Sequence, residues 1–441
     1  MKFLYDNYDS KRNIPYPNLW DKTLIDYFSN KDGDYMIAND NKFQFRTLHS
    51  NIWWYHSSDI KNHEYIQNVK ENDEKYIYPI EIFSQIDFIT DRVLKTTDDI
   101  EYSFSIRNIS KKSIDLALNN RLIFAVNYSH EPFLNTFNFI KKLEKITNEI
   151  GLDLKKHFVF FVGTSNLFEQ DIRFKDYNFY FENNLLIGFA ERLASLKKEP
   201  NYTLGYETKY INEDEIDVSR TKYFVCLNRN SNKDFRYTLG CFFESKKLWD
   251  KIYASFLFPF DGEHKMYITD NIQFDKEMLL YADNFSKKLI MEVDTENEED
   301  KYGFECGRAY KKEIYLNSYI YIVTETNFEK DIFLTEKIIN PMTVLQPFIV
   351  LGAHGYLKYL KELGFKTFDG FIDENYDNIE NDGERYIAIC NEIERLSNID
   401  LKIIHDWYLS IKDILIHNRN HILSWNGKQQ NAFVENLKKH I

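Results

Sequence analysis

Cysteine is scarce in this chain, and its four residues stand far apart. Cys226, Cys241, Cys306 and Cys390 form no CxxC pair and no Cys/His cluster. Such clusters are the usual way to hold zinc or a redox disulfide. The spacing therefore excludes a cysteine-based metal or redox motif, and it indicates a reducing, cytoplasmic setting (the host cytoplasm if the chain is viral).

Long apolar runs and an excess of positive charge are also missing. No window approaches the ~18 uninterrupted apolar residues of a membrane span, and the start MKFLYDNYDSKRNIPYP has no basic region followed by an apolar stretch. The formal net charge is -13, so no broad basic face is available to neutralise phosphates along a nucleic acid. We expect a soluble protein with no membrane span and no extensive nucleic-acid face, although a local basic cleft is compatible with these numbers.

The chain is long enough to bury more than one core. It has 441 residues, 43% of them hydrophobic, and two domains is the default for that length. Aromatic residues reach 17%, but Lys, Asn and Ile are abundant too, which is the signature of AT-rich codons. Aromatic patches are therefore weak evidence for a sugar or base platform.

Apolar strands and amphipathic helices alternate in both halves. In the first half, a strand at 121–129, a helix that Gly151 ends and a strand at 157–163 form a unit typical of a parallel sheet with a right-handed crossover. In the second half, the pattern predicts strands at 223–228, 313–325, 347–352 and 365–368, with helices between them. We expect two α/β domains, 1–212 and 213–398, followed by a helical segment, 399–441.

The stretch FLTEKIINPMTVLQP, residues 333–347, predicts a helix that begins with two opposite charges. Thr335 is a good N-cap, and Glu336 and Lys337 fall in the first turn. The free N–H groups and the positive end of the helix dipole favour an anion, to which Lys337 adds a full charge, so phosphate suits this site. Glu336 would suit ribose hydroxyls. The alternative is that Glu336 only complements the dipole and that Lys337 is solvated.

The stretch YFVCLNRNSNKDFR, residues 223–236, places Arg229 just past the carboxyl end of a strand. Open α/β sheets bind ligands at that edge, and a guanidinium suits a pyrophosphate. Asn228 could hold the turn. Arg236 lies in the following helix, where it could either reach back to the site or form a surface salt bridge.

The segment 333–377 resembles the donor-binding half of GT-B glycosyltransferases. Its FLTEK opening, the proline-led strand PFIVLG and the run LGFKTFDGFIDENYD are most similar to alpha-1,3-fucosyltransferase-like enzymes and to glycosyltransferase-like proteins of phages and giant viruses; the resemblance extends over roughly 222–400. It implies a GT-B-like α/β fold with two Rossmann-like domains facing across a cleft, an acceptor-binding first domain and a nucleotide-sugar-binding second one. It also implies that Glu336 binds the donor ribose and Lys337 the diphosphate. The C-terminal helix could cross the seam between the domains.

An acceptor hydroxyl would need a base, and NYSHEPF, residues 127–133, follows a strand at its carboxyl end. In an inverting transfer, a carboxylate or imidazole removes the acceptor proton. Glu131 is our first candidate and His130 the second. The alternative is that Glu131 belongs to a helix entrance and that His130 packs on Tyr128.

Metal and other polar motifs have ordinary explanations. The Asp-x-Asp of KDGDYM, residues 31–36, is a turn signal, and the histidines His405, His417 and His421 are typical of packing or surface positions. The resemblance implies that the acidic run FIDENYD, residues 371–377, is mainly a structural loop near the donor site, and VGTSNLF, residues 162–168, has the composition of a strand-to-helix turn. We therefore predict no metal site.

The sequence thus predicts an inverting, metal-independent glycosyltransferase with no cofactor other than its nucleotide-diphosphate sugar co-substrate. The acceptor would be a glycan, a protein or a modified nucleobase. The alternatives are a nucleotide-sugar-binding protein without chemistry and a GT-B-type epimerase or phosphorylase.

Overall fold

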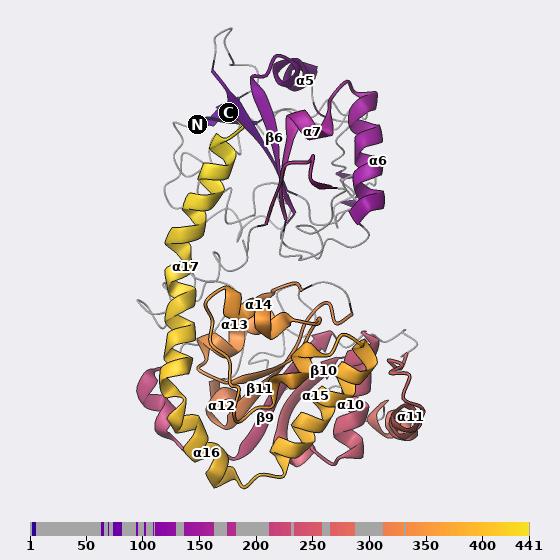
Figure 1. Cartoon of the computed structure of the whole chain (residues 1–441), viewed down its shortest axis with the longest axis vertical. Coiled ribbons are helices and arrows are strands. Elements are labelled where there is room, and N and C mark those ends of the chain that lie inside the picture. The colour runs from indigo at the N-terminus through magenta and orange to yellow at the C-terminus, as the bar shows by residue number, and fades with distance from the viewer. Residues whose placement is uncertain are drawn as a thin grey trace. The chain divides into compact units, whose positions relative to one another are not determined.

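The computed structural model describes fifteen stretches of the chain, which fall into two compact units. The stretches are 2–5, 63–65, 69, 74–81, 94–95, 101–102, 109, 111–128, 136–162, 174–181, 211–230, 233–257, 265–286, 312–329 and 332–440. Unit 1 comprises Met1–Gly188 and Gly427–Ile441, and unit 2 comprises Phe189–Asn426. Figure 1 shows the elements of both units.

Unit 1 is built on a parallel sheet with the strand order β2-β1-β3-β6-β7-β8. Every neighbouring pair in this sheet is parallel. The strands are β1 (Lys2–Tyr5), β2 (His63–Tyr65), β3 (Tyr76–Glu81), β6 (Leu122–Tyr128), β7 (Phe158–Val162) and β8 (Phe179–Phe181). A separate antiparallel pair consists of β4 (Leu94–Lys95) and β5 (Glu101–Tyr102).

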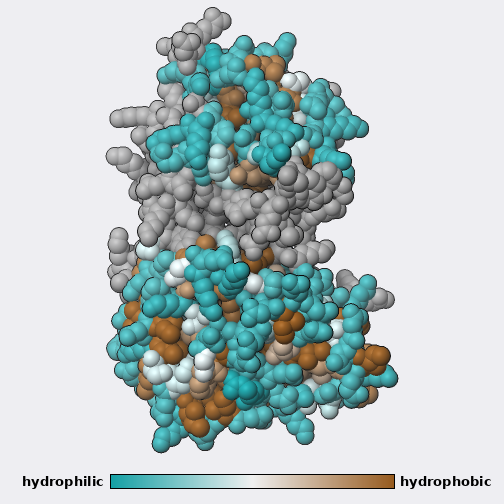
Figure 2. Space-filling model, viewed as in Figure 1, coloured by the Kyte–Doolittle hydropathy of each residue, from teal (hydrophilic) through white to brown (hydrophobic). Residues whose placement is uncertain are grey.

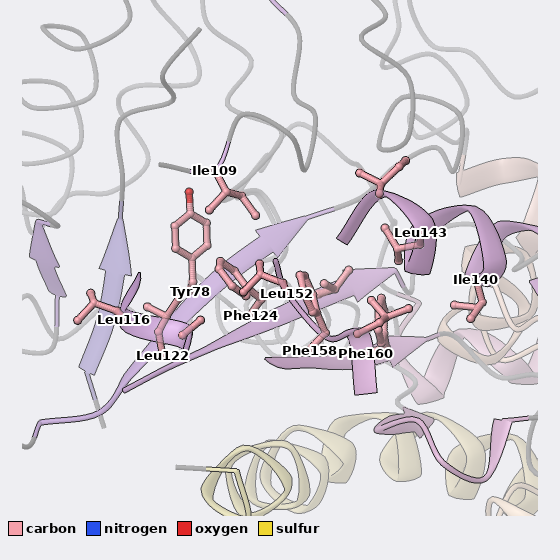
Figure 3. Close-up of a cluster of buried hydrophobic side chains, with 14 of the residues drawn as sticks. Tyr78, Ile109, Leu116, Leu122, Phe124, Ile140, Leu143, Leu152, Phe158 and Phe160 are labelled. Carbon is pink, nitrogen blue, oxygen red and sulfur yellow. The ribbon is translucent and has the colours of Figure 1, made fainter. Parts of the chain in front are cut away.

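The strand–helix–strand unit predicted in the first half is confirmed. Between β6 and β7 lie α6 (Thr136–Glu149) and the short α7 (Leu154–His157), and α5 (Lys111–Leu118) precedes β6. Gly151 has φ +81°, a left-handed conformation that favours glycine just past a helix end. Figure 3 shows how Ile140 and Leu143 of α6 join Phe158 and Phe160 of β7 in one buried cluster.

Unit 2 is built on a second parallel sheet, with the order β10-β9-β11-β12. Its strands are β9 (Lys222–Asn230), β10 (Ile252–Leu257), β11 (Ser318–Thr324) and β12 (Phe348–Leu351). Every residue of β11 and β12 is buried, as expected for parallel strands that are covered on both faces.

The helices of unit 2 follow its strands in the predicted alternation. They are α10 (Asp234–Ser245), α11 (Ile272–Ser286), α12 (Lys312–Leu316), α13 (Glu336–Thr343), α14 (Tyr356–Glu362), α15 (Asp382–Ser397) and α16 (Leu401–Ser410), with 3-10 turns η5 (Glu213–Asp217), η6 (Trp249–Lys251) and η8 (Glu374–Asn378). The long α17 (Lys412–Lys438) belongs to unit 2 up to Asn426 and to unit 1 from Gly427 onward.

Two strand predictions in this half were wrong. The expected strand at 313–325 begins with a helical turn, α12, and only 318–324 is extended. Residues 365–368 do not pair with any strand in the described part of the chain. Instead, the Asn418 side chain of α17 accepts from the Lys366 backbone N–H at 2.8 Å and donates to the Lys366 carbonyl at 2.8 Å. A side-chain amide thus satisfies the backbone groups that a neighbouring strand would have satisfied.

The boundaries of the compact units, after Gly188 and after Asn426, differ from the expected domain boundaries at 212 and 398. Arg419 of α17 donates to the Ile211 carbonyl at 2.6 Å and to Glu213 at 2.8 Å. The acidic run 212–217 therefore packs inside unit 2, and so do α16 and the first part of α17.

The predicted α/β class with two Rossmann-like units is confirmed, because each unit has a parallel sheet whose strands alternate with helices.

No helix in the described part of the chain combines the length and the apolar character that a membrane crossing needs. Figure 2 shows apolar residues on the surface where Figure 1 places α11, and Ile272, Leu279 and Leu280 of this helix are exposed.

Candidate functional site

The strand order of unit 2 reverses between β9 and β11. From β9 the chain moves to β10 on one side, and the later strand β11 pairs with β9 on the other side. Ligands of open α/β sheets bind in the crevice outside the carboxyl ends of the strands at such a switch point. In unit 2 these ends carry Asn228 on β9 and Thr324 and Glu325 on β11.

Asn228 and Arg236 form hydrogen bonds at the carboxyl ends of β9 and β11. The Thr324 hydroxyl donates to Oδ1 of Asn228, so the two central strands are joined at their carboxyl ends. Arg236, on α10, donates to the Thr324 carbonyl and to the Glu325 carbonyl, each at 2.9 Å. Arg236 therefore reaches back to the strand ends, which is the first of the two arrangements that the sequence allows. Asn228 and Arg236 are both buried.

Glu325 lies at the centre of the site and has no exposed surface. One carboxylate oxygen accepts from the Thr335 hydroxyl at 2.6 Å, and the other accepts from the Tyr356 hydroxyl at 2.5 Å. Thr335 is the N-cap of α13, and Tyr356 is the first residue of α14. The carboxylate therefore fixes the amino ends of two helices at the carboxyl end of β11.

Thr335 and Lys337 adopt the geometry that the sequence predicts for a helix start. The Thr335 hydroxyl accepts from the Lys337 backbone N–H at 3.2 Å. The Lys337 ammonium lies 3.3 Å from the hydroxyl of Thr326 and 3.3 Å from that of Thr335. Lys337 is half-buried, so it is not the fully solvated lysine of the alternative interpretation.

The structure gives the backbone positions of Arg229 and Glu336. Phe256 pairs with Asn228 and Leu257 with Asn230, which makes Arg229 the extra residue of a β-bulge on β9. Such bulges are frequent beside active sites, where they redirect a side chain. β9 extends through Asn230, so Arg229 lies in its last residues, and Glu336 is the first residue of α13.

The acidic loop beside the site has a structural role, as expected. Asp377 accepts from the backbone N–H groups of Leu357 at 2.9 Å and Lys358 at 3.0 Å, at the start of α14. Burial raises the pKa of the Asp377 carboxyl, and the two backbone donors oppose that rise. Glu374 accepts from Thr367 at 2.7 Å and from Lys361 at 3.0 Å.

Within the described ranges, no group of three or more His, Cys, Asp or Glu side chains could hold a metal ion. His417 and His421 instead lie 3.0 Å and 2.7 Å from the carbonyls of Gly364 and Leu363, just after α14. Of the cysteines, Cys226, Cys241 and Cys390 are buried free thiols. Burial raises the pKa of each, which keeps the thiols protonated and unreactive.

Several predicted positions lie outside the described residues. They are the base candidates Glu131 and His130, the acidic turn at 31–36, the polar turn after residue 162, and Cys306.

The structure adds Glu325 and Tyr356 to the predicted set. Both carry a signal that the sequence analysis did not use. Glu325 is a charged residue at the end of the apolar run SYIYIVT, and Tyr356 opens a helix after a proline-led strand. A charged residue at the carboxyl end of a buried strand is a candidate for a site in an open α/β sheet.

No protein-family model matches the chain, and no curated protein is significantly similar to it. Similar solved structures include the alpha,alpha-trehalose 6-phosphate synthase from Burkholderia multivorans, with 10% identity, a TM-score of 0.36 and coverage of 73% of this chain and 67% of that one. An alpha,alpha-trehalose-phosphate synthase (UDP-forming) from Burkholderia vietnamiensis has 9% identity, a TM-score of 0.32 and coverage of 84% and 94%. Identities this low leave the activity of the chain to be derived from its own residues.

Proposed function

We propose that the chain is a glycosyltransferase that moves a sugar from a nucleotide-diphosphate sugar to an acceptor hydroxyl, with inversion and without a metal. The donor would bind to unit 2 at the carboxyl edge of β9 and β11. The observation that carries the proposal is the position of Lys337. Its half-buried ammonium lies in the first turn of α13, a helix that starts beside the switch point of the sheet, so charge and helix dipole favour the same anion.

The chemistry would follow from where charge develops. The acceptor oxygen attacks the anomeric carbon, the bond from that carbon to the β-phosphate oxygen breaks, and the acceptor proton passes to a base, for which Glu131 and His130 are the candidates. Lys337, Arg229 and the amino end of α13 would stabilise the charge that grows on the departing diphosphate. Glu336 would accept from the ribose hydroxyls. Asn228, Arg236 and Thr335 would hold the strand ends and the helix start in place.

The finer resemblance to alpha-1,3-fucosyltransferase-like enzymes and to phage and giant-virus proteins stays a prediction about donor sugar and source. The acceptor class, whether glycan, protein or modified nucleobase, belongs to the same proposal.

Two measurements test the proposal together. A thermal-shift screen with nucleoside mono- and diphosphates should show a higher melting temperature with one diphosphate, because a ligand of the native state stabilises it by RT ln(1 + [L]/Kd), about 2.7 kcal/mol at 100 Kd. The matching nucleotide sugar should then release free nucleotide slowly in the absence of an acceptor. Binding without any release would favour a non-catalytic binding protein, and no response to any diphosphate would overturn the donor site itself.

A further inference from the structure

A cavity of about 90 Å³ lies at the amino edge of the unit 1 sheet. It is lined by Tyr76, the first residue of β3, by Leu122, the first of β6, and by His157, which directly precedes β7. Because these strands are parallel, their amino ends meet at one edge, opposite the carboxyl edge where such sheets bind substrates. A single water needs roughly 10–15 Å³ of such space, so the cavity has room for several water-sized groups.

The lining of this cavity is strongly cationic. Lys75, Arg121 and Lys156 contribute three positive charges, and none of the described residues that line the cavity is Asp or Glu. The whole chain has a formal net charge of -13, so the charge of the lining is opposite to that of the protein. An anion in this cavity would therefore be attracted from several sides.

His157 lines the cavity and carries a buried donor that is unpaired within the described part of the chain. The Asp153 backbone N–H donates to Nδ1 of His157 at 2.8 Å, which assigns the ring proton of the neutral imidazole to Nε2. The side chain is 5% exposed, and Nε2 has no hydrogen-bond partner among the described residues. Burial lowers the pKa of His157, so the ring is a neutral donor. A buried N–H left unpaired costs about 1–3 kcal/mol, so this group next to the cavity is a donor that lacks an acceptor in the ranges that the structure describes.

The neighbouring groups hold this lining in place. Arg121 donates through Nε to the Glu74 carbonyl at 3.3 Å, and the Glu74 carboxylate accepts from the Tyr76 hydroxyl at 3.0 Å. The carboxyl end of α5 also lies here, but the carbonyls of Leu116 and Ala117 already accept from the backbone N–H groups of Arg121 and Asn120, each at 2.9 Å.

A further lining residue is also engaged. Nε2 of His440 lies 2.8 Å from the Tyr180 hydroxyl.

We infer that this cavity binds a compact oxyanion such as a phosphate group, held by Lys75, Arg121 and Lys156, with the buried Nε2–H of His157 next to it. The site is independent of the donor site proposed in unit 2. An oxyanion here would tie together the starts of three strands and would stabilise unit 1.

The experiment is a calorimetric titration of the full chain with inorganic phosphate, against chloride at equal ionic strength. The protein carries Lys337→Glu, so that phosphate binding at the proposed donor site does not contribute. The variant Lys75→Glu with Lys156→Glu reverses two exposed cations of the lining. The control Lys142→Glu with Lys145→Glu makes the same charge change on exposed positions of α6 away from the cavity.

We expect the Lys337→Glu parent to bind one phosphate per chain. The Lys75 and Lys156 variant should bind phosphate about tenfold or more weakly than this parent, and the control should bind it within about twofold of the parent. The additional variant His157→Phe should also weaken binding, while circular dichroism checks that it folds. Absence of phosphate binding in the parent, or equal binding in both double variants, would overturn the inference without bearing on the donor site.

Discussion

Thr335 donates its hydroxyl hydrogen to Glu325 over 2.6 Å, and the carboxylate that accepts it has no exposed surface. The Thr335 hydroxyl oxygen in turn accepts from the Lys337 backbone N–H. One hydroxyl therefore joins the end of β11 to the start of α13 and sets where the Lys337 ammonium lies.

Replacing Thr335 by Val should destabilise the protein. The change removes an N-cap, worth about 1 kcal/mol, and leaves the buried Glu325 carboxylate short of a donor, at about 1–3 kcal/mol. Thr335→Ser keeps the hydroxyl and should lose much less. Denaturant unfolding of both variants checks this, and equal losses for Val and Ser would contradict the role of the hydroxyl.

Replacing Gly240 by Ala should destabilise the protein although alanine favours helices by about 1 kcal/mol. Gly240 lies inside α10, and a Cβ there would approach the Phe285 ring of α11 to 2.0 Å. We expect a loss of about 1–3 kcal/mol, as for overpacked cores.

The control for this clash is Phe285→Leu. In that background, Gly240→Ala should cost much less, because the ring it meets is gone. A double-mutant cycle in urea measures the coupling, and additive effects would show that the close contact with Phe285 is not the cause.

Replacing Tyr408 by Phe should loosen the attachment of α16 to the amino edge of unit 2. The Tyr408 hydroxyl accepts from Arg220 and donates to the Leu345 carbonyl at 2.9 Å. Both partners are buried, so their loss of a hydrogen bond should cost about 1–3 kcal/mol. Tyr281→Phe, on the half-buried face of α11, should change stability by less than about 0.5 kcal/mol.

Protonation of His157 should make the chain less stable in mild acid. Burial lowers the pKa of His157 and of His440 below the ordinary value of 6.5. The unfolded chain then binds more protons than the native one, so the two histidines cost no stability above pH 6.5 and lower the free energy of unfolding as the pH drops below it. The slope between pH 7 and pH 5 should be smaller in His157→Gln with His440→Gln. An unchanged slope would contradict this assignment.

Much of the fold is predictable from the sequence, for a physical reason. Parallel strands buried on both faces appear as short apolar runs, as β6, β7 and β12 do, and a helix start is marked by a capping side chain, as at Thr335. The run 365–368 shows where this reasoning stops. Phe365 and Phe368 are buried like strand residues, but the backbone between them is satisfied by Asn418, which lies fifty-two residues further along the chain.

The site was predictable in part for a similar reason. Thr335 and Lys337 lie two residues apart in sequence and share a local motif, so their arrangement follows from helix geometry. Glu325 is joined to them only through tertiary contacts, with Thr335 ten residues later and Tyr356 thirty-one residues later. Its position after the apolar run SYIYIVT marks Glu325 as a candidate, but the partners that satisfy its carboxylate are known only from the fold.

The most direct test of the donor site is calorimetric binding of the nucleoside diphosphate selected by the thermal-shift screen to Lys337→Glu and Lys402→Glu. Lys402 is an exposed lysine in the first turn of α16, which Figure 1 shows at the end of unit 2 opposite α13, so the charge change is matched. We predict that Lys337→Glu weakens binding by about tenfold or more, because it puts a negative charge where the diphosphate would lie, and that Lys402→Glu leaves binding within about twofold of the unmodified chain. Equal binding by both variants would contradict the proposed diphosphate site.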